Sequence, residues 1–210
     1  MRTFLPARRP GPGVLLIHSW WGCTRSFEAY GAALAERGFV VGLADLFNGR
    51  TASTPGGASL LRRAPRREPM YRSLIANLTE LRTKQHTSIS TDVGIVGFSM
   101  GGHWAIWLAQ RADLPVASCV IYYAARAGEF ANSHASFLAH FAENDEWVRP
   151  DARRRMEAAI RKAQRPYTAF DYPGTHHWFA EEDRAEEHAP EPAALAFERT
   201  VAHLNATLSR

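Results

Sequence analysis

Short apolar runs alternate with helical patterns along most of this 210-residue chain. Six runs have the length of buried strands, at residues 14–18, 39–44, 93–97, 118–123, 137–142 and 167–172, and a short edge strand is expected at residues 3–5. Several of the six are apolar throughout, which is typical of parallel strands covered on both faces. The pattern predicts an α/β fold with a mostly parallel, doubly wound sheet of six to seven strands flanked by helices.

Helical patterns fill the spaces between these strands. They cover residues 26–37, a segment that begins at Pro69, residues 100–110, residues 150–164, and a final helix with Leu195, Val201, Leu204 and Leu208 on one stripe. Residues 48–67 are polar, Arg-rich and without a period, so we expect a long loop there. Neither an internal repeat nor a domain boundary is evident, and the sequence predicts a single domain over residues 1–210.

Composition narrows the class of protein. The hydrophobic fraction is 46% and the formal charge is only +4, from 25 basic and 21 acidic side chains. One basic group, formed by Arg62, Arg63, Arg66 and Arg67, is interpreted as a solvated face, and no nucleic-acid partner is expected. The two cysteines make no disulfide framework. With no signal-peptide pattern and no apolar run long enough to span a membrane, the sequence predicts a cytoplasmic protein with no membrane partner.

The strongest chemical signal is Gly97-Phe98-Ser99-Met100-Gly101, which joins an apolar run to a helical segment. A serine on a tight strand-to-helix turn has its hydroxyl exposed at the end of a sheet, and glycines on either side leave room for the neighbouring backbone. Ser99 is therefore the candidate nucleophile. The backbone N–H of the next residue, Met100, is the first candidate donor to an oxyanion.

A serine nucleophile needs a base and a carboxylate that orients it, both from loops at the carboxyl ends of later strands. Asp145 follows the run 137–142 and is the best-placed acid, ahead of Glu143 and Glu146. His176 and His177 follow the last predicted strand, where the base belongs. Adjacent histidines do not have metal-ligand spacing, so neither a metal nor another cofactor is expected.

With these residues in place, the chain resembles the dienelactone hydrolase family of α/β-hydrolases over nearly its whole length. The resemblance rests on five segments: His18-Ser19-Trp20-Trp21-Gly22, Asp45-Leu46-Phe47, Gly97-Phe98-Ser99-Met100-Gly101-Gly102, Val148-Arg149-Pro150, and Tyr172-Pro173-Gly174 before the histidines. It implies an α/β-hydrolase fold. The family's spacing after Tyr-Pro-Gly implies that His177, rather than His176, is the base. It also implies that the Trp20 N–H is the second oxyanion donor.

The chain departs from the family pattern at several positions. Ser99 stands where dienelactone hydrolase itself has Cys, and Ser19 where it has Glu. Glu181 stands where the family has an arginine for a substrate carboxylate, and Arg50 matches the other such arginine only in a shifted arrangement. If Glu181 faces the pocket it would repel an anion. We therefore expect neutral esters to be preferred. Ser19, Trp21, Arg50 and Trp178 are the candidate pocket residues.

The sequence thus predicts a serine hydrolase that cleaves a small-molecule carboxylic ester or lactone through an acyl-serine intermediate formed on Ser99, with His177 and Asp145. Two alternatives stay open. A thioesterase or peptidase would use the same three residues, and a non-catalytic binding protein could retain the fold. The sequence leaves the oligomeric state open.

Overall fold

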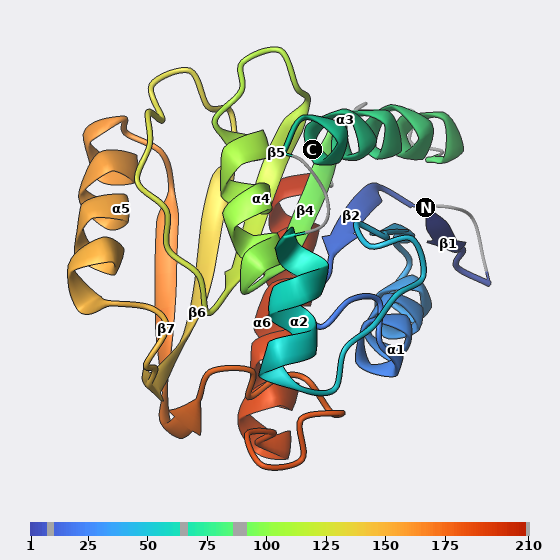
Figure 1. Cartoon of the computed structure of the whole chain (residues 1–210). Helices are drawn as coiled ribbons and strands as arrows, with labels where there is room; N and C mark the ends of the chain where they lie inside the picture. The colour runs from blue at the N-terminus through green and yellow to red at the C-terminus, as the bar shows by residue number, and fades with distance from the viewer. Residues whose placement is uncertain (8–10, 64–66, 86–91, 209–210) are drawn as a thin grey trace.

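A computed structural model describes residues 1–7, 11–63, 67–85 and 92–208 of the chain. Its centre is a seven-stranded sheet with the strand order β1-β3-β2-β4-β5-β6-β7, in which only the edge strand β1 is antiparallel to its neighbour (Figure 1). The strands are β1 (Arg2–Phe4), β2 (Gly13–Ile17), β3 (Val40–Ala44), β4 (Val93–Phe98), β5 (Val116–Tyr122), β6 (Ser136–Asn144) and β7 (Tyr167–His176). The predicted α/β fold with a mostly parallel sheet is confirmed.

Six helices complete the described part of the chain: α1 (Arg25–Glu36), α2 (Pro55–Arg63), α3 (Arg67–Lys84), α4 (Met100–Ala109), α5 (Pro150–Lys162) and α6 (Pro190–Leu208). Two differ from expectation. Helix α3 begins at Arg67 instead of Pro69. Helix α2 lies inside the stretch 48–67 that was predicted to be a loop, and that prediction was wrong. Residues 64–66 of the same stretch, including Arg66, lie outside the described residues.

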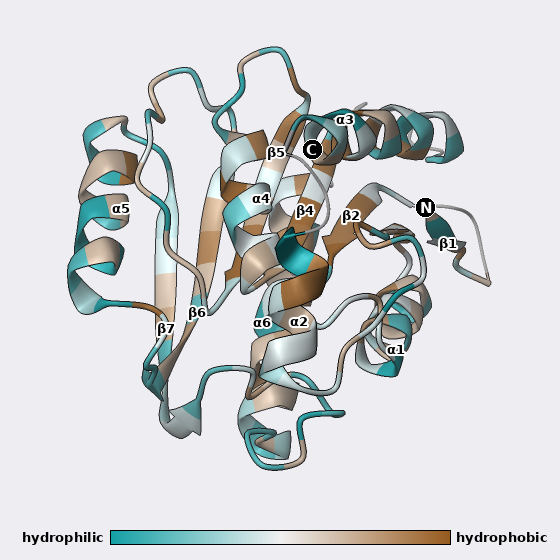
Figure 2. Cartoon of the chain, in the orientation of Figure 1, coloured by the Kyte–Doolittle hydropathy of each residue, from teal (hydrophilic) through white to brown (hydrophobic). Residues whose placement is uncertain are grey.

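The sheet has a hydrophobic core on each face, because successive strand side chains point to opposite sides. In β2, Leu15 and Ile17 belong to the core under α3, α4 and α5, whereas Val14 and Leu16 belong to the core under α1 and α6. The hydropathy colouring follows this layering, with brown strands inside and teal residues along the outer sides of α3 and α5 (Figure 2).

The strand order creates a switch point next to β2. The chain passes from β2 to β3 on one side and then returns to β4 on the other, so β2 lies between them, with Ile17 beside Gly97. Ligand sites of open α/β sheets lie at the carboxyl ends of strands beside such a point. The loops after β2 and β4 therefore meet where a site is expected.

Candidate active site

Ser99 lies on a sharp turn between β4 and α4, in a backbone conformation that is unusual for a side-chain-bearing residue (φ 50°, ψ −111°). The turn needs its glycines, since a Cβ on Gly97 would collide with the Gly101 carbonyl and one on Gly101 with the Ile17 carbonyl. The Ser99 N–H donates to the Tyr122 carbonyl at 3.0 Å. Such a conformation costs about 1–3 kcal/mol and survives only where the surroundings enforce it. The turn that the surroundings enforce holds the Ser99 hydroxyl at the carboxyl edge of the sheet.

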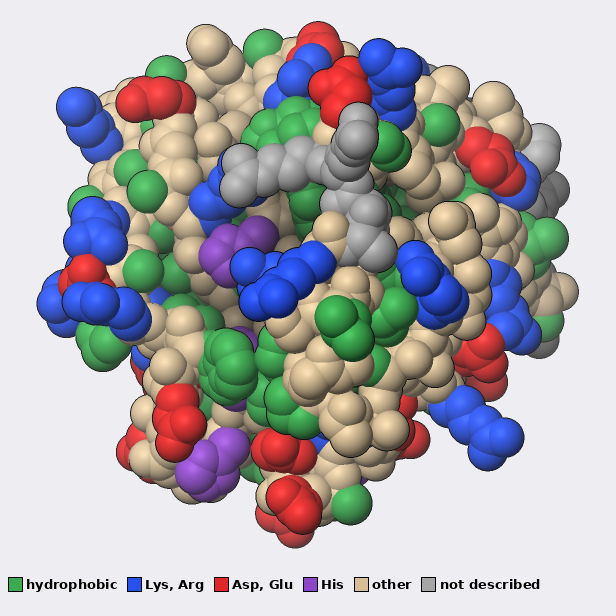
Figure 3. Space-filling view, viewed as in Figure 1, with side chains coloured by type: hydrophobic (Ala, Val, Ile, Leu, Met, Phe, Trp, Pro, Cys, Tyr) green, Lys and Arg blue, Asp and Glu red, His purple; other side chains and the backbone are tan. Residues whose placement is uncertain are grey.

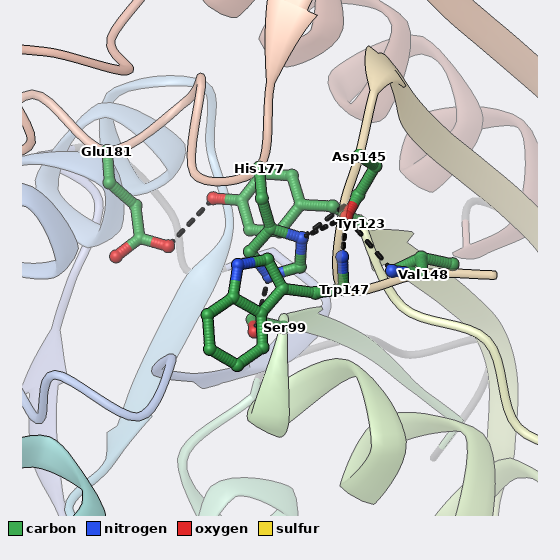
Figure 4. A network of polar contacts seen from close by, with 7 residues as sticks. All are labelled: Ser99, Tyr123, Asp145, Trp147, Val148, His177 and Glu181. Carbon is green, nitrogen blue, oxygen red and sulfur yellow. Dashed lines mark hydrogen bonds and ion pairs between the residues drawn. The ribbon is translucent and has the colours of Figure 1, made fainter. Parts of the chain in front are cut away.

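Three side chains form a continuous hydrogen-bonded chain at this edge (Figure 4). The Ser99 Oγ lies 2.8 Å from His177 Nε2, and His177 Nδ1 lies 2.9 Å from both carboxylate oxygens of Asp145. The side chains of His177 and Asp145 are only 5% and 6% exposed. The three residues singled out from the sequence are therefore brought together from the loops after β4, β6 and β7.

Asp145 is held in place by the backbone as well as by His177. Its Oδ1 accepts hydrogen bonds from the N–H groups of Trp147 at 2.8 Å and Val148 at 2.9 Å. Burial alone would raise the pKa of Asp145, but these bonds and the interaction with His177 outweigh it and lower the pKa below its ordinary value. The carboxylate is thus ionised at neutral pH and can orient the imidazole.

The neighbouring candidates occupy other places. The His176 side chain is exposed, and its carbonyl accepts the Phe179 N–H in the turn that follows. The Glu143 carboxylate accepts the Gly174 N–H at 2.8 Å, and Glu146 is exposed. Among these alternatives, only His177 and Asp145 are hydrogen-bonded into the chain that reaches Ser99.

The turn after β2 leaves one backbone donor unused. Ser19 accepts the N–H of Trp21 on its hydroxyl at 3.4 Å and the N–H of Gly22 on its carbonyl at 3.3 Å. Between them, the Trp20 N–H has no hydrogen-bond acceptor among the described residues. Met100 is the first residue of α4, where N–H groups have no partner within the helix. These are the two candidate oxyanion donors.

A cavity of about 690 Å³ opens beside Ser99 and His177. One part of its wall is aromatic, where the rings of Trp20 and Trp178 stack with centroids 5.9 Å apart and Trp147 lies against both. Another part is basic, with Arg62, Arg63, Arg126 and His103. The remaining lining residues are Met70, Tyr71, Met100, Trp104, Tyr123 and Val148. Figure 3 shows Lys and Arg side chains beside a His side chain near the middle of this face.

Three of the predicted pocket residues do not line the cavity. Ser19 and Trp21 are buried behind it, and Arg50 is exposed elsewhere, with its Nε donating to the Phe47 carbonyl at 3.1 Å. Trp178 does line it, as does the Trp20 ring. Arg62 and Arg63, interpreted from the sequence as part of a solvated basic face, lie at the cavity although they are exposed. Tyr123 was not predicted from the sequence to be a site residue, although it ends a predicted strand at the carboxyl edge of the sheet, where the site lies.

Glu181 does not face the cavity, which removes the premise for expecting it to repel an anionic substrate. It is completely buried and accepts hydrogen bonds from the hydroxyls of Ser19 and Tyr123, both at 2.8 Å. Ser19 and Glu181, two positions at which the chain departs from the family pattern, are therefore in direct contact.

One group of side chains with metal-binding atoms lies together in the described part of the chain: His18, Cys23 and Asp45, within 4.8 Å of one another. Both ring nitrogens of His18 are already used, since Nδ1 donates to the Ser19 carbonyl and Nε2 accepts the Leu46 N–H at 3.1 Å. Asp45 accepts the N–H groups of Phe47 and Gly49. The arrangement braces the loops after β2 and β3 and does not fit a metal ion. Among the described helices, none has both the length and the apolar character needed to cross a membrane.

Comparison with known proteins gives the same kind of fold and a family. A family model described as the dienelactone hydrolase family matches residues 2–208. Protein usf of Aquifex pyrophilus is 28% identical over 204 residues, which cover 91% of this chain and 87% of that protein. A protein of Aquifex aeolicus, provisionally named a carboxymethylenebutenolidase, is 26% identical over 200 residues, covering 91% of this chain and 86% of its own length.

Solved structures share the fold at low sequence identity. A promiscuous dienelactone hydrolase-like phosphotriesterase from metagenomic libraries has a TM-score of 0.83 at 16% identity, covering 95% of this chain and 88% of that one. Esterase PE8 has a TM-score of 0.72 at 15% identity, covering 99% and 98%. These neighbours show the fold, and the family match supports a hydrolase.

Proposed function

The chain belongs to the dienelactone hydrolase family, and on that premise we propose that it cleaves a carboxylic ester or lactone through an acyl-serine intermediate. The observation that carries the proposal is the hydrogen-bonded chain from Ser99 through His177 to Asp145. A serine hydroxyl within reach of an imidazole that is itself oriented by a carboxylate is the arrangement that activates serine for acyl transfer.

In the acylation step, Ser99 Oγ attacks the ester carbonyl and its proton passes to His177 Nε2. The carbonyl oxygen becomes an oxyanion, which the N–H groups of Trp20 and Met100 stabilise. Collapse of this intermediate breaks the bond to the alcohol oxygen, and His177 returns the proton to that oxygen. Asp145 stabilises the imidazolium while it carries the extra proton.

In the deacylation step, water replaces the alcohol. His177 removes a proton from the water as it attacks the acyl carbon, and the same two N–H groups hold the second oxyanion. The proton then returns to Ser99 Oγ as the bond to the acyl group breaks. The products are a carboxylic acid and an alcohol, or a single hydroxy acid from a lactone.

The first test is covalent labelling with a fluorophosphonate probe, followed by peptide mapping. We expect one modified serine, Ser99, and no label on Ser99→Ala. A matched variant, Ser26→Ala, removes a buried serine hydroxyl that bonds the Asp183 N–H instead of a histidine and should label normally. Hydrolysis of p-nitrophenyl esters of increasing chain length measures the activity. A folded protein that takes up no label, or takes it up at another serine, would contradict the proposal.

The second test separates the two adjacent histidines. Replacing His177 by Ala should lower kcat by about 10³-fold or more, because the general base is lost. Replacing exposed His176 by Ala should leave kcat within about 10-fold. If His176→Ala proves to be the inactive variant, the assignment of the base is wrong by one position.

A further inference from the structure

Glu181 is a buried carboxyl group with two neutral partners. Its side chain is completely buried, its Oε2 accepts the Ser19 hydroxyl and its Oε1 accepts the Tyr123 hydroxyl, both at 2.8 Å. Buried polar groups normally serve a purpose that offsets the cost of removing them from water. Since Glu181 lies outside the cavity, that purpose is not contact with substrate.

Ser19 connects Glu181 to the turn after β2. The Ser19 hydroxyl has one proton, which it donates to Glu181, and its oxygen accepts the Trp21 N–H at 3.4 Å. Glu181 therefore fixes the rotation of the Ser19 hydroxyl, which in turn holds the backbone on the far side of Trp20. The unpaired Trp20 N–H lies between these two anchored residues.

Tyr123 connects Glu181 to the base. The Tyr123 ring lies 4.9 Å from the His177 ring, centroid to centroid, and the Tyr123 N–H donates to the His140 carbonyl at 2.7 Å. Figure 4 shows Glu181 bonded to the Tyr123 hydroxyl on the side of the imidazole away from Asp145. Tight turns between His177 and Glu181, including the Glu181 N–H donating to the Trp178 carbonyl at 2.9 Å, bring the carboxyl back under the site.

We propose that Glu181 is a positioning residue that links the turn of Ser19 and Trp20 to the loop of His177. Its hydrogen bonds thereby keep an oxyanion donor and the base in a fixed position relative to each other. The inference rests on the proposed function. A donor aimed at the oxyanion acts on the transition state more than on bound substrate. Loss of the hydrogen bonds of Glu181 should therefore lower kcat and leave KM nearly unchanged.

The experiment compares three variants on one p-nitrophenyl ester. Glu181→Ala removes the hydrogen bonds with Ser19 and Tyr123. Ser19→Ala keeps the bond with Tyr123 and removes the two bonds of the Ser19 hydroxyl, to Glu181 and from the Trp21 N–H. Each should lower kcat by about 10- to 100-fold, less than the loss of an oxyanion donor itself, with KM within about 3-fold. Glu181→Gln keeps one carbonyl oxygen and offers an N–H to the second hydroxyl, so it should keep kcat within about 3-fold of wild type.

Ser133→Ala is the stability control. Ser133 is also fully buried, and its hydroxyl donates to the Ala109 carbonyl, but it precedes β6 at the opposite end of the strand from Asp145. This variant should lower the melting temperature with kcat unchanged. If Glu181→Ala behaves in the same way, or if Ser19→Ala retains full kcat, the inference is wrong. Should Glu181→Ala fail to fold, the pair Ser19→Ala and Glu181→Gln decides the result.

The probe separates the two levels of the proposal. If wild-type protein is neither labelled by fluorophosphonate at Ser99 nor active on esters, the proposed function fails, and the inference fails with it. If wild-type protein is labelled and active while kcat of the variants is unchanged, only the inference fails.

Discussion

Some ionisable side chains of this protein are buried, so its stability depends on their protonation, and Glu181 is the clearest case. Burial raises the pKa of its carboxyl to about 8 from an ordinary value of 4.5, in spite of the hydrogen bonds from Ser19 and Tyr123. At neutral pH the group is therefore protonated. The bare oxygen of the neutral carboxyl still accepts the Ser19 hydroxyl, and its O–H replaces Tyr123 as the donor in the other hydrogen bond. A glutamine at this position resembles that neutral form.

The raised pKa predicts how stability depends on pH. Between about pH 4.5 and 8 Glu181 keeps a proton in the folded protein that it releases in the unfolded chain, so its contribution to the free energy of unfolding falls as pH rises through this window. The contribution is at most about 1.4 kcal/mol per pH unit and stops above the folded pKa. In urea denaturation from pH 5 to 9, this slope should appear in the difference in the free energy of unfolding between wild type and Glu181→Gln.

The control for this prediction is the exposed neighbour, Glu182→Gln, which should follow the wild-type curve. Parallel curves for wild type and Glu181→Gln would show that Glu181 is already ionised in the folded protein at low pH.

At the scale of elements, α2 determines the electrostatic character of the cavity. It brings Arg62 and Arg63 to the wall that also contains Arg126, and none of the three forms an ion pair with the described residues. With Glu181 bonded away from the cavity, the reason for expecting a preference for neutral esters no longer holds. We therefore expect these cations, which have no ion-pair partner among the described residues, to favour an ester that carries a negative charge.

Helix α2 therefore yields a prediction about substrate charge. Changing both Arg62 and Arg63 to Gln should lower kcat/KM for an ester with a terminal carboxylate by about 3- to 10-fold, because exposed charge pairs contribute only about 0.2–1 kcal/mol each. A neutral ester of equal length should be unaffected. Arg154→Gln, an exposed substitution on α5, serves as the matched control. An equal loss on both esters would mean that the arginines do not interact with the substrate's charge.

The sequence predicted some elements better than others for physical reasons. The strands were predictable because runs such as Leu15–Leu16 are buried on both faces, and Ser99 because its turn requires glycines at fixed spacing. Helix α2 was not, since Gly56 and Gly57 weaken the helical signal and only Ala58 is buried. The direction in which Glu181 points depends on tertiary turns that no local pattern encodes.

Across the whole molecule, one hydrogen-bond network joins the helix layer of α1 and α6 to three strands of the sheet. It runs from Tyr30 on α1 to Tyr122 on β5 at 3.0 Å, then to Thr200 on α6 at 2.9 Å. Thr200 lies 3.1 Å from His140 Nε2 on β6, and His140 Nδ1 lies 2.7 Å from the Tyr172 hydroxyl on β7. Every member of such a network is satisfied only when all five elements are packed.

This network predicts acid sensitivity of the fold. Burial lowers the pKa of His140 to about 3, helped by the nearby charges of Arg199 and His203. His140 therefore stays unprotonated in the folded protein at pH values below about 6.5, where the unfolded chain binds a proton, so its contribution to stability is lost as pH falls from there toward 3. His140→Gln should be less stable at pH 7 but lose less on acidification, as measured by urea denaturation. His134 is exposed, so His134→Gln should lose as much stability on acidification as wild type does. If His140→Gln also loses as much stability as wild type, the prediction is wrong.

Because separate loops supply Ser99, Asp145 and His177, covalent labelling of the site reports the fraction of molecules that are folded. Ser99 and His177 are 78 residues apart in the chain, and His177 and Asp145 are 32 apart. The unfolded ensemble cannot hold these groups together, since closing such loops costs entropy that only the packed sheet offsets. Irreversible labelling of Ser99 by a fluorophosphonate would therefore occur only in folded molecules. The amount of label formed during a brief pulse at each denaturant concentration would give the unfolding curve without any optical signal.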